Sequence, residues 1–317
     1  MSEKIKMATR EAYGKALASL APEMPDLVVL DADLSGSTKT KEFAKVAPER
    51  FFNCGIAEAD MIGVACGLAS SGKIPIASSF AVFAAGRAFE QIRNSVCYGK
   101  QNVKIAATHA GITVGEDGGT HQAIEDIAIM RALPGMTVIV PSDWVQTLWA
   151  VRAAAAYDGP VYLRLGRLAA PQVYEEYQKF DWGKGLLVRE GKDIVIFACG
   201  MMVSEALAAA DILAEAGISA AVADVHTIKP LDKDFVLEQA KKCGAALSVE
   251  EHTVLGGLGS AIAETLAEAG LGLPFLRLGL QDQFGQSGKP AELLRHYGLD
   301  GASIAAKAKE VLRRNKA

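Results

Sequence analysis

The chain has 317 residues, of which 50% are hydrophobic and 22% charged, and its formal net charge at pH 7 is -4. This length predicts two domains of ordinary size, and the weakly negative charge gives no attraction to nucleic acid or to an anionic membrane. The apolar runs are as short as strands and are interrupted by charge or glycine, which indicates neither a signal peptide nor a membrane span. We therefore expect no nucleic-acid partner and no membrane partner.

The cysteines of the chain are scattered and form no C-x-x-C pair. They are Cys54, Cys66, Cys97, Cys199 and Cys243. Their spacing argues against a disulfide framework and against a zinc site. Because it is typical of reduced structural thiols, we expect a cytoplasmic protein.

In the first part of the chain, apolar segments of strand length alternate with segments of helical periodicity. The predicted strands are Leu27–Leu30, Phe51–Cys54, Ile74–Ser78, Val103–Thr108, Thr137–Val140 and Val161–Leu165. The predicted helices are Thr9–Leu20, Ala57–Ser70, Gly86–Tyr98, Ile124–Leu133 and Trp144–Tyr157. This alternation is typical of a mostly parallel sheet with helices on both faces, joined by right-handed crossovers.

The composition changes between Pro171 and Lys192, where the segment QVYEEYQKFDWGKG is polar, aromatic and without a clear period. We interpret this segment as a linker to a second domain that repeats the alternation. Its predicted strands are Ile194–Ala198, Ser219–Val225, Ala246–Glu250 and Phe275–Leu278, and its predicted helices are Ser204–Ala216, Lys233–Lys241, Ser260–Ala269 and Ala302–Leu312. The predicted fold class is α/β with two domains, at residues 1–180 and 190–317, each a mostly parallel sheet flanked by helices.

The stretch FFNCGIAEADMIGVACG, residues 51–67, begins as a strand and continues as a helix, and Glu58 lies in the first turn of that helix. Acidic residues favour helix N-termini because the macrodipole is positive there, and this alone can explain Glu58. The alternative is a functional carboxyl group. Because alanine and glycine surround it, this group would be poorly solvated and could share a proton with a ligand nitrogen.

Two phenylalanines, Phe80 and Phe83, precede a predicted helix in the stretch SSFAVFAAGRAFEQIR, residues 78–93. Core packing is the simplest explanation for either of them. Two phenylalanines this close together could also line a flat apolar slot for an aromatic ring, since ring pairs stack with modest specific energy.

The stretch HAGITVGEDGGTHQ, residues 109–122, follows a strand-like run and precedes a predicted helix. It holds two histidines, an adjacent Glu116-Asp117 pair and four glycines, with few large apolar groups. A solvated surface loop is one interpretation. The other is a ligand site, because open α/β sheets bind their ligands in polar loops at the carboxyl ends of buried strands.

The stretches GIAEADMIGVACGLA, SSFAVFAAGRAFEQIR and ATHAGITVGEDGGTHQAIEDIAIMRALPGMTVIVPSD occur in an order and spacing that resembles the pyrimidine-binding domain of transketolase. The stretch SVEEHTVLGGLGSAIAE extends the resemblance to the C-terminal domain of that family, so it covers essentially the whole chain. The resemblance implies a thiamine diphosphate pyrimidine-binding domain and a transketolase C-terminal-like domain. The implied reaction moves a two-carbon ketol unit from a ketose phosphate to an aldose phosphate.

A full-length transketolase also has a domain that holds the cofactor pyrophosphate through Mg²⁺, with a GDG motif as its signature, and this sequence contains no GDG. The chain therefore resembles the C-terminal subunit of a split transketolase. This implies an N-terminal partner subunit with the pyrophosphate-binding domain and the Mg²⁺, and an α₂β₂ heterotetramer. We expect no metal ligand in this chain, because the spacing of His109, Asp117 and His121 is not a strong ligand pattern.

The resemblance also implies which residues contact the cofactor. Glu58 matches the glutamate that hydrogen-bonds the aminopyrimidine ring and helps to activate the thiazolium carbon. Phe80 and Phe83 match the aromatic residues that pack on the pyrimidine. Catalytic roles are therefore expected for Glu58 and, next to the reacting carbonyl, for His121 and His109, since histidine titrates near neutrality.

On the substrate side, His109 and Asp117 match residues that hydrogen-bond sugar hydroxyls. Arg10, Ser37 and Arg167 match positions that bind the phosphate of a sugar phosphate, and the bidentate geometry of arginine suits such a site. Surface solvation alone would explain either arginine taken singly.

Two other functions are compatible with this resemblance. One is that of a β-subunit of a 2-oxo-acid dehydrogenase or of an enzyme like deoxyxylulose-phosphate synthase, which share the cofactor and the fold. The other is a catalytically silent subunit that only assembles. The stretch TVGEDGGTHQ is closer to the transketolase form, and Arg10 and Ser37 favour a sugar phosphate. A silent subunit has no physical need for Glu58 together with both histidines.

Overall fold

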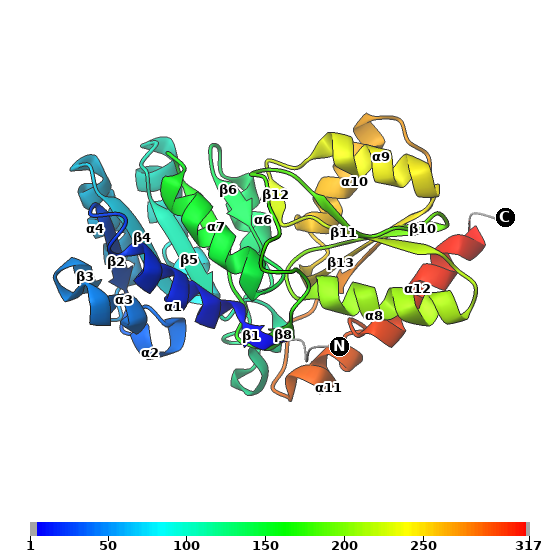
Figure 1. The fold of residues 1–317 in the computed structure, drawn as a ribbon, viewed down its shortest axis with the longest axis horizontal. Helices are drawn as coiled ribbons and strands as arrows, with labels where there is room; N and C mark the ends of the chain where they lie inside the picture. Colours follow the sequence, from blue (N-terminus) through cyan, green and yellow to red (C-terminus); the bar gives the residue numbers. More distant parts are fainter. Residues whose placement is uncertain (1–4, 315–317) are drawn as a thin grey trace.

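Two mostly parallel sheets lie side by side in the computed structural model, which describes residues 5–314 (Figure 1). The first sheet has seven strands in the order β12-β6-β7-β5-β4-β2-β3, and the second has five in the order β14-β13-β10-β11-β9. Within these sheets, only the pairs β12 with β6 and β9 with β11 are antiparallel. The predicted α/β fold class is confirmed.

The strands of the first sheet present successive side chains to opposite faces. They are β2 (Leu27–Asp31), β3 (Phe51–Asn53), β4 (Ile74–Phe80), β5 (Lys104–Thr108), β6 (Thr137–Ile139), β7 (Val161–Arg164) and β12 (Thr227–Lys229). In β2, Leu27 and Val29 belong to one hydrophobic cluster, whereas Val28 and Leu30 belong to another. This alternation is the period of two that a strand imposes, and it gives the sheet two apolar faces that helices must cover.

Helices cover both faces of this sheet. On one face lie α1 (Thr9–Leu20) and α7 (Trp144–Ala156), and on the other lie α4 (Glu58–Ser70), α6 (Asp126–Ala132) and the segment formed by η2 (Val82–Arg87), α5 (Phe89–Gln91) and η3 (Ile92–Tyr98). Between β2 and β3 the chain forms α2 (Ser35–Thr38), α3 (Lys41–Val46) and η1 (Pro48–Arg50). This arrangement brings the carboxyl ends of β2, β4 and β5 to one edge of the sheet, because neighbouring parallel strands end on the same side.

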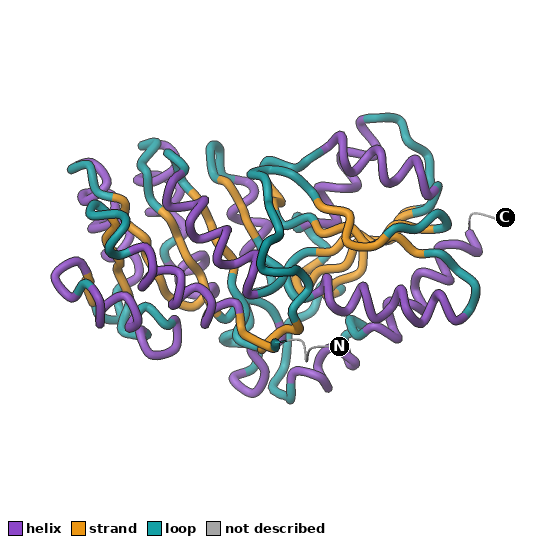
Figure 2. The backbone as a smooth tube through the Cα atoms, viewed as in Figure 1, coloured by secondary structure: helices purple, strands orange, loops and turns teal. Residues whose placement is uncertain are grey.

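The second sheet is covered in the same way. Its strands are β9 (Leu186–Arg189), β10 (Ile194–Ala198), β11 (Ala220–Asp224), β13 (Ala246–Thr253) and β14 (Phe275–Leu280). The helices α8 (Met202–Glu215) and α12 (Gly301–Arg314) share a hydrophobic cluster on one face, whereas α9 (Lys233–Cys243) and α10 (Leu258–Glu268) cover the other. Figure 2 shows the strands of this sheet enclosed between its helices.

The two halves of the chain share one sheet and one core. Strand β12 leaves the second half and pairs with the edge of the first sheet, with Thr227 opposite Ile139 and Lys229 opposite Val138. A single hydrophobic cluster continues from Val138 in β6 to Phe197 in β10. The sequence did not predict β12, because a three-residue strand is too short to show a period. The halves are consequently joined by backbone hydrogen bonds as well as by side-chain packing.

The segment between Pro171 and Lys192 has more structure than the linker that we predicted. Its C-terminal part forms β9, an edge strand antiparallel to β11, and Pro171 ends β8 (Ala169–Pro171), which pairs with β1 (Lys6–Ala8). Tyr174 and Phe180 are buried against Val145. Two of the aromatic residues of this segment therefore form a small core with Val145, whereas Tyr177 is exposed.

The helix predicted at Gly86–Tyr98 begins earlier and is not a regular α-helix. Helical backbone starts at Val82, and its first and last parts have the wider π-helical turn, separated by α5. The hydrophobic pattern that predicts an α-helix has a period near 3.6 residues. It therefore does not reveal π-helical turns, which have a longer period. A short helix, α11 (Pro290–His296), and a 3₁₀ segment, η4 (Ile112–Asp117), were also not predicted. The 3₁₀ segment η4 is part of the glycine-rich loop, and α11 packs against it.

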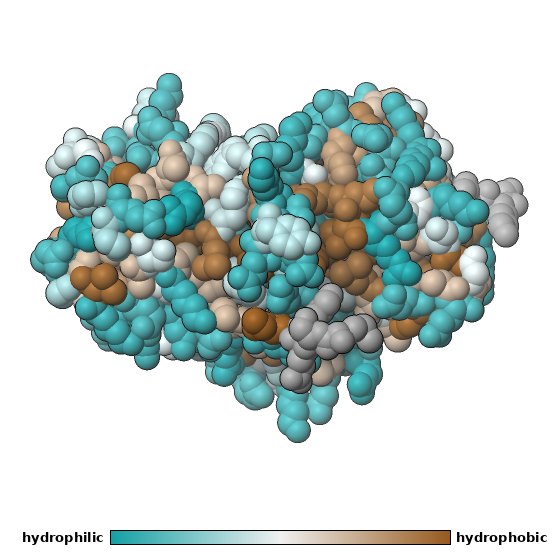
Figure 3. Space-filling view, viewed as in Figure 1, coloured by the Kyte–Doolittle hydropathy of each residue, from teal (hydrophilic) through white to brown (hydrophobic). Residues whose placement is uncertain are grey.

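Polar and charged side chains cover most of the face seen in Figure 3, and hydrophobic side chains gather near the boundary between the two halves. Phe284, at 84%, and Ile56, at 78%, are among the most exposed large hydrophobic residues. None of the helices that the structure describes combines the length and the apolar character needed to cross a bilayer.

Asp224, the last residue of β11, is buried, and its raised pKa should make the free energy of unfolding depend on pH. Its carboxylate accepts hydrogen bonds from the Tyr174 hydroxyl (2.7 Å) and from Gln146 Nε2 (2.9 Å), yet burial raises the pKa of Asp224 to about 7. Because an unfolded aspartate titrates near 4, the unfolded chain binds fewer protons than the folded chain between these pH values. We expect the free energy of unfolding to fall as pH rises from about 4 to about 7, by at most about 1.4 kcal/mol per pH unit from this group.

The D224N variant isolates this effect, because asparagine keeps the shape of the side chain but does not titrate. We expect the melting temperature of the variant to fall less steeply between pH 5 and pH 7.5 than that of the unmodified chain. Thermal unfolding followed by circular dichroism at several pH values measures both slopes. Equal slopes would show that Asp224 is ionised throughout this range.

Candidate functional site

Glu58 is the first residue of α4 and is only 1% exposed. Its carboxylate accepts a hydrogen bond from Ser79 Oγ at 3.3 Å and from Arg87 Nη1 at 2.7 Å. The Arg87 side chain is half exposed, and its guanidinium lies over the ring of Phe83, 4.6 Å from the centroid. A buried carboxylate needs a partner, and Arg87 supplies it from the solvent side.

An aromatic stack lies next to Glu58. Phe80, the last residue of β4, stacks with Phe83 at 5.9 Å between ring centroids and with the ring of His109 at 3.7 Å. His121 meets Phe83 edge-on at 5.5 Å. The two phenylalanines and two histidines proposed from the sequence thus form one cluster of flat rings, of the kind that can pack against an aromatic ligand.

His109 is held in one protonation state and one tautomer. It follows β5 with a positive φ of 58°, and its ring is almost completely buried. Arg10 Nη1 donates to His109 Nε2 (3.2 Å), so the ring proton lies on Nδ1, which donates to Thr108 Oγ1 (2.9 Å). Burial, followed by the charges of Arg10 and Arg167, lowers the pKa of His109 to about 3. The ring is therefore neutral at physiological pH.

Two arginines form a cationic rim on the other side of His109. Arg10 donates to the Ser37 carbonyl at 2.9 Å, and Arg167 forms an ion pair with Asp117 at 3.5 Å. Burial and the nearby charge of Arg167 lower the pKa of Arg10, and within residues 5–314 the buried Arg10 Nε has no hydrogen-bond acceptor. Two close cations with an unused donor favour an anion between them, and arginine binds phosphate well.

The loop that carries Ser37 is fixed by a residue that the sequence analysis did not single out. Asp31, the last residue of β2, accepts hydrogen bonds from Leu34 N and from the hydroxyls of Thr38 (2.7 Å) and Thr40 (2.8 Å). These bonds wrap the loop around the end of the strand. Ser37 is thereby held beside Arg10.

All the residues proposed from the sequence lie in this one region, linked by contacts from Glu58 through the ring stack to Arg10 and Arg167. Sequence reasoning overlooked the partners that hold them, which are Ser79, Arg87, Asp31 and, from the second half, Glu251. A signal was available for Arg87, which stands in the same stretch as Phe80 and Phe83, but a charge on a helix usually indicates a solvated face.

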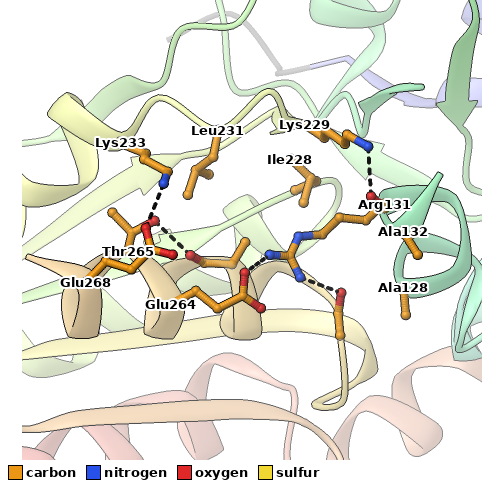
Figure 4. Close-up of a pocket in the computed structure, with 12 residues that line it drawn as sticks. Ala128, Arg131, Ala132, Ile228, Lys229, Leu231, Lys233, Glu264, Thr265 and Glu268 are labelled. Carbon is orange, nitrogen blue, oxygen red and sulfur yellow. Dashed lines mark hydrogen bonds and ion pairs between the residues drawn. The ribbon is translucent and has the colours of Figure 1, made fainter. Parts of the chain in front are cut away.

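A separate cavity of about 500 Å³ lies between α6 and α10, lined by Arg131, Lys229, Lys233, Glu264 and Glu268 among others (Figure 4). Each of its three cations already has hydrogen-bond partners, and Lys229 donates to the carbonyls of Arg131 and Leu133. Arg131 bonds Glu264 and the Gly256 carbonyl, and Lys233 bonds Glu268 at 2.8 Å. The cavity therefore offers a ligand no unused cation like Arg10.

Both halves of the sequence match known protein families. Residues 5–172 match the pyrimidine-binding domain of transketolase, and residues 183–304 match the transketolase C-terminal domain. The chain belongs to the transketolase family. Like other transketolases, it is expected to act together with thiamine diphosphate, because this dependence is a property of the family.

The chain matches some transketolase relatives over nearly their whole length and others over only about half of it. It is 52% identical to a putative transketolase C-terminal section of Methanocaldococcus jannaschii, over 96% of both chains. It is 38% identical to human transketolase, of which it spans 48%. A solved structure of a split-gene transketolase, described as an inactive β4 tetramer, superimposes with a TM-score of 0.91 at 53% identity, covering 98% of this chain and 99% of that one.

The residues around Glu58 fit the pyrimidine half of thiamine diphosphate. A buried carboxylate acceptor beside two stacked phenylalanine rings suits a ring nitrogen and an aromatic face. Glu58 would hold the ring nitrogen, and Phe80 and Phe83 would contact the ring. Within residues 5–314, no group of three or more His, Cys, Asp or Glu side chains is arranged to hold a metal ion.

The contact of Arg10 with His109 can be tested directly. Replacing Arg10 by methionine removes both a positive charge and the hydrogen bond to Nε2, so we expect the pKa of His109 to rise from its low value. NMR titration of the histidine ring protons measures this change, with the His109→Gln variant identifying the resonance. In the control variant R152M, which removes the same charge at an exposed pair with Glu23, the titration should not move.

Proposed function

We propose that this chain is the C-terminal subunit of a split transketolase and that its ring cluster and cationic rim form the pyrimidine and substrate half of the active site. The observation that carries the proposal is the buried Glu58 carboxylate next to the Phe80–Phe83 stack, with Arg10 and Arg167 at the other end of the same cluster. Glu58 and the phenylalanine rings are complementary to a weakly basic aromatic ring, and Arg10 and Arg167, at the opposite end of the cluster, are complementary to an anionic substrate.

Thiamine diphosphate, when bound, supplies the carbon nucleophile that takes up the two-carbon unit. In this chain, Glu58 holds a proton at the pyrimidine nitrogen, and Arg87 and Ser79 keep the carboxyl group in place. The rings of Phe80 and Phe83 exclude water from one face of the pyrimidine. His121, half-buried against Phe83, moves protons near the reacting carbonyl.

At the substrate end, Arg10, Arg167 and Ser37 bind the phosphate of the sugar phosphates. Asp117 accepts hydrogen bonds from the sugar hydroxyls. The neutral His109 also accepts one at Nε2, when a hydroxyl replaces the Arg10 donor there. The ion pair of Arg167 with Asp117 opens when a phosphate competes for the guanidinium. The donor and acceptor are thereby oriented toward the cofactor.

The partner in this proposal is an N-terminal subunit that carries the pyrophosphate-binding domain and the Mg²⁺. Support comes from the end-to-end match to a C-terminal section in M. jannaschii and from the match to about half of human transketolase. The full enzyme would be an α₂β₂ assembly with sites shared between chains. The free cysteines among the described residues support a reducing, cytoplasmic location.

Ketol transfer from xylulose 5-phosphate to ribose 5-phosphate tests the proposal. The assay contains thiamine diphosphate and Mg²⁺, with this chain alone or co-expressed with a candidate N-terminal subunit that contains GDG. Activity only in the mixture supports a split transketolase. Activity in the chain alone rejects the partner, turnover of pyruvate instead favours the dehydrogenase or deoxyxylulose-phosphate-synthase alternative, and inactivity with both favours a silent subunit.

The Glu58→Ala variant of the active mixture is the critical companion experiment. We expect loss of nearly all turnover, because Glu58 is the buried carboxylate that Ser79 and Arg87 hold next to the ring cluster. The Glu90→Ala variant is a suitable control, since Glu90 is an exposed carboxylate in α5, three residues after Arg87, and it accepts a hydrogen bond from Gln91. Near-normal turnover in E58A would reject the assignment of Glu58.

The phosphate site is tested by comparing two donors. In the R167M variant we expect kcat/KM for a ketose phosphate to fall about tenfold to a hundredfold, the usual effect of losing one charge-assisted hydrogen bond. The same ketose without its phosphate should lose much less. Steady-state kinetics with both donors measures the difference, and an equal loss for both would mean that Arg167 only supports the loop.

A further inference from the structure

The loop that carries His109, Asp117 and His121 makes few hydrogen bonds with the sheet from which it emerges. Near its ends, the backbone forms an isolated bridge between Ala110 and Ala123, a bond from Gly111 N to the Ala123 carbonyl at 2.8 Å, and a bond from Ala110 N to the Leu165 carbonyl at 3.2 Å. From the first half, Arg167 also donates to the Val114 carbonyl. Gly111, Gly115 and Gly118 have positive φ, which other residues rarely adopt. Such a segment keeps one shape only if neighbouring elements fix it.

Glu251, in β13 of the second sheet, fixes the start of this loop. Its Oε2 atom accepts hydrogen bonds from Thr113 N (3.2 Å) and from Thr113 Oγ1 (2.8 Å). The carboxylate also lies so close to Gly111 that a Cβ atom there would overlap it. Burial raises the pKa of Glu251, whereas the charge of Arg164 and the bonds from Thr113 oppose that rise. The loop backbone is therefore shaped around this side chain.

Arg164 ties the end of the same loop to the same strand. It forms a buried ion pair with Asp126 at 2.8 Å and donates from Nη2 to the carbonyls of Ala123 (3.3 Å) and Glu251 (3.2 Å). A fully buried guanidinium with these partners resists displacement, because moving it would leave charges unpaired. The start of the loop is therefore bonded to the Glu251 side chain, and its end is linked through Arg164 to the Glu251 carbonyl.

The middle of the loop rests on the second half as well. Gln122 Nε2 donates to the Gln286 carbonyl at 3.0 Å. A Cβ atom at Gly119 would lie 2.7 Å from the Gly285 carbonyl oxygen, and one at Gly118 would overlap the Ser287 hydroxyl. The loop follows the surface of the second half closely, without room for a larger residue.

We infer that Glu251 is a positioning residue for ketol transfer, through which the C-terminal domain sets the geometry of the substrate-side residues His109, Asp117 and His121. This rests on the proposed function, because those residues act in the reaction only if the chain is a transketolase subunit. Glu251 touches the loop at Thr113 and Gly111 and does not itself reach the ring cluster.

The test uses the assembled two-subunit enzyme and compares E251M with E250M. Methionine has a similar length but lacks the carboxylate oxygens that accept the two hydrogen bonds from Thr113. Glu250 is the neighbouring, equally buried carboxylate, but its bonds go to Leu258 N (2.7 Å) and Gly259 N (2.8 Å) at the start of α10. We expect kcat/KM for the ketose phosphate to fall about tenfold to a hundredfold in E251M and less than about threefold in E250M, because misplaced catalytic groups cost this much.

A purely structural role would lower the melting temperature of both variants and leave kcat/KM similar in both, and that result would overturn the inference. T113V provides a second route if E251M does not fold. It removes only the hydroxyl group that donates a hydrogen bond to Glu251. We expect a smaller loss in kcat/KM than in E251M. The KM for the ketose donor should rise, and the apparent affinity for thiamine diphosphate should stay unchanged. Unaltered kinetics in T113V and E251M would also reject the inference.

The two proposals fail separately in this experiment. An unmodified assembly without transketolase activity rejects the proposed function. An active unmodified assembly in which E251M behaves like E250M rejects only the positioning role.

Discussion

The loop between β5 and α6 depends on hydrogen bonds from outside its own sheet, and this constraint shapes the whole molecule. Its backbone turns at glycines where φ is positive, and its regular structure is limited to the short 3₁₀ segment η4. Each polar group that it buries needs a partner elsewhere, because an unpaired buried N–H or C=O is costly. The second half meets part of that need through the Glu251 side chain in β13 and the Gln286 carbonyl in the loop after β14, and these contacts join the two halves.

The charges in the site are divided between two ends. At one end a carboxylate is shielded by an exposed arginine, and at the other end two arginines face each other with an unused donor. Between them lie flat rings with little charge, because His109 is neutral. A ligand made of an aromatic ring and a phosphorylated chain would meet a partner of matching polarity at each end. The ring stack also separates the Glu58 carboxylate from the guanidinium groups of Arg10 and Arg167, so these opposite charges do not pair directly.

The parts of the site that the sequence predicted are those written in short, contiguous stretches. Glu58 follows a strand within a few residues, and the Phe80–Phe83 pair and the glycine-rich loop are local patterns that composition and spacing reveal. The roles given to these residues came from the family resemblance. What local patterns could not reveal is which distant group supports each residue. Glu251 is 138 positions away from Thr113, and nothing in either stretch encodes that pairing.

The fold shows the same division between local and distant information. The buried strands and amphipathic helices were predicted from their periods, whereas β12 and the π-helical turns after Val82 were not. A three-residue strand acquires its conformation from the edge of the sheet that it joins. A helix with a wider turn acquires it from packing, which overrides local preference.

Strand β12 has a consequence for anyone who divides this chain into its two halves. A cut in residues 172–185 would leave the first half without its outermost strand, because β12 comes from beyond the cut. The N–H and C=O groups of β6 would then face water along an open edge, which is a template for association with other chains. The two halves are therefore separate units in sequence but not in folding, and an isolated N-terminal fragment would tend to aggregate.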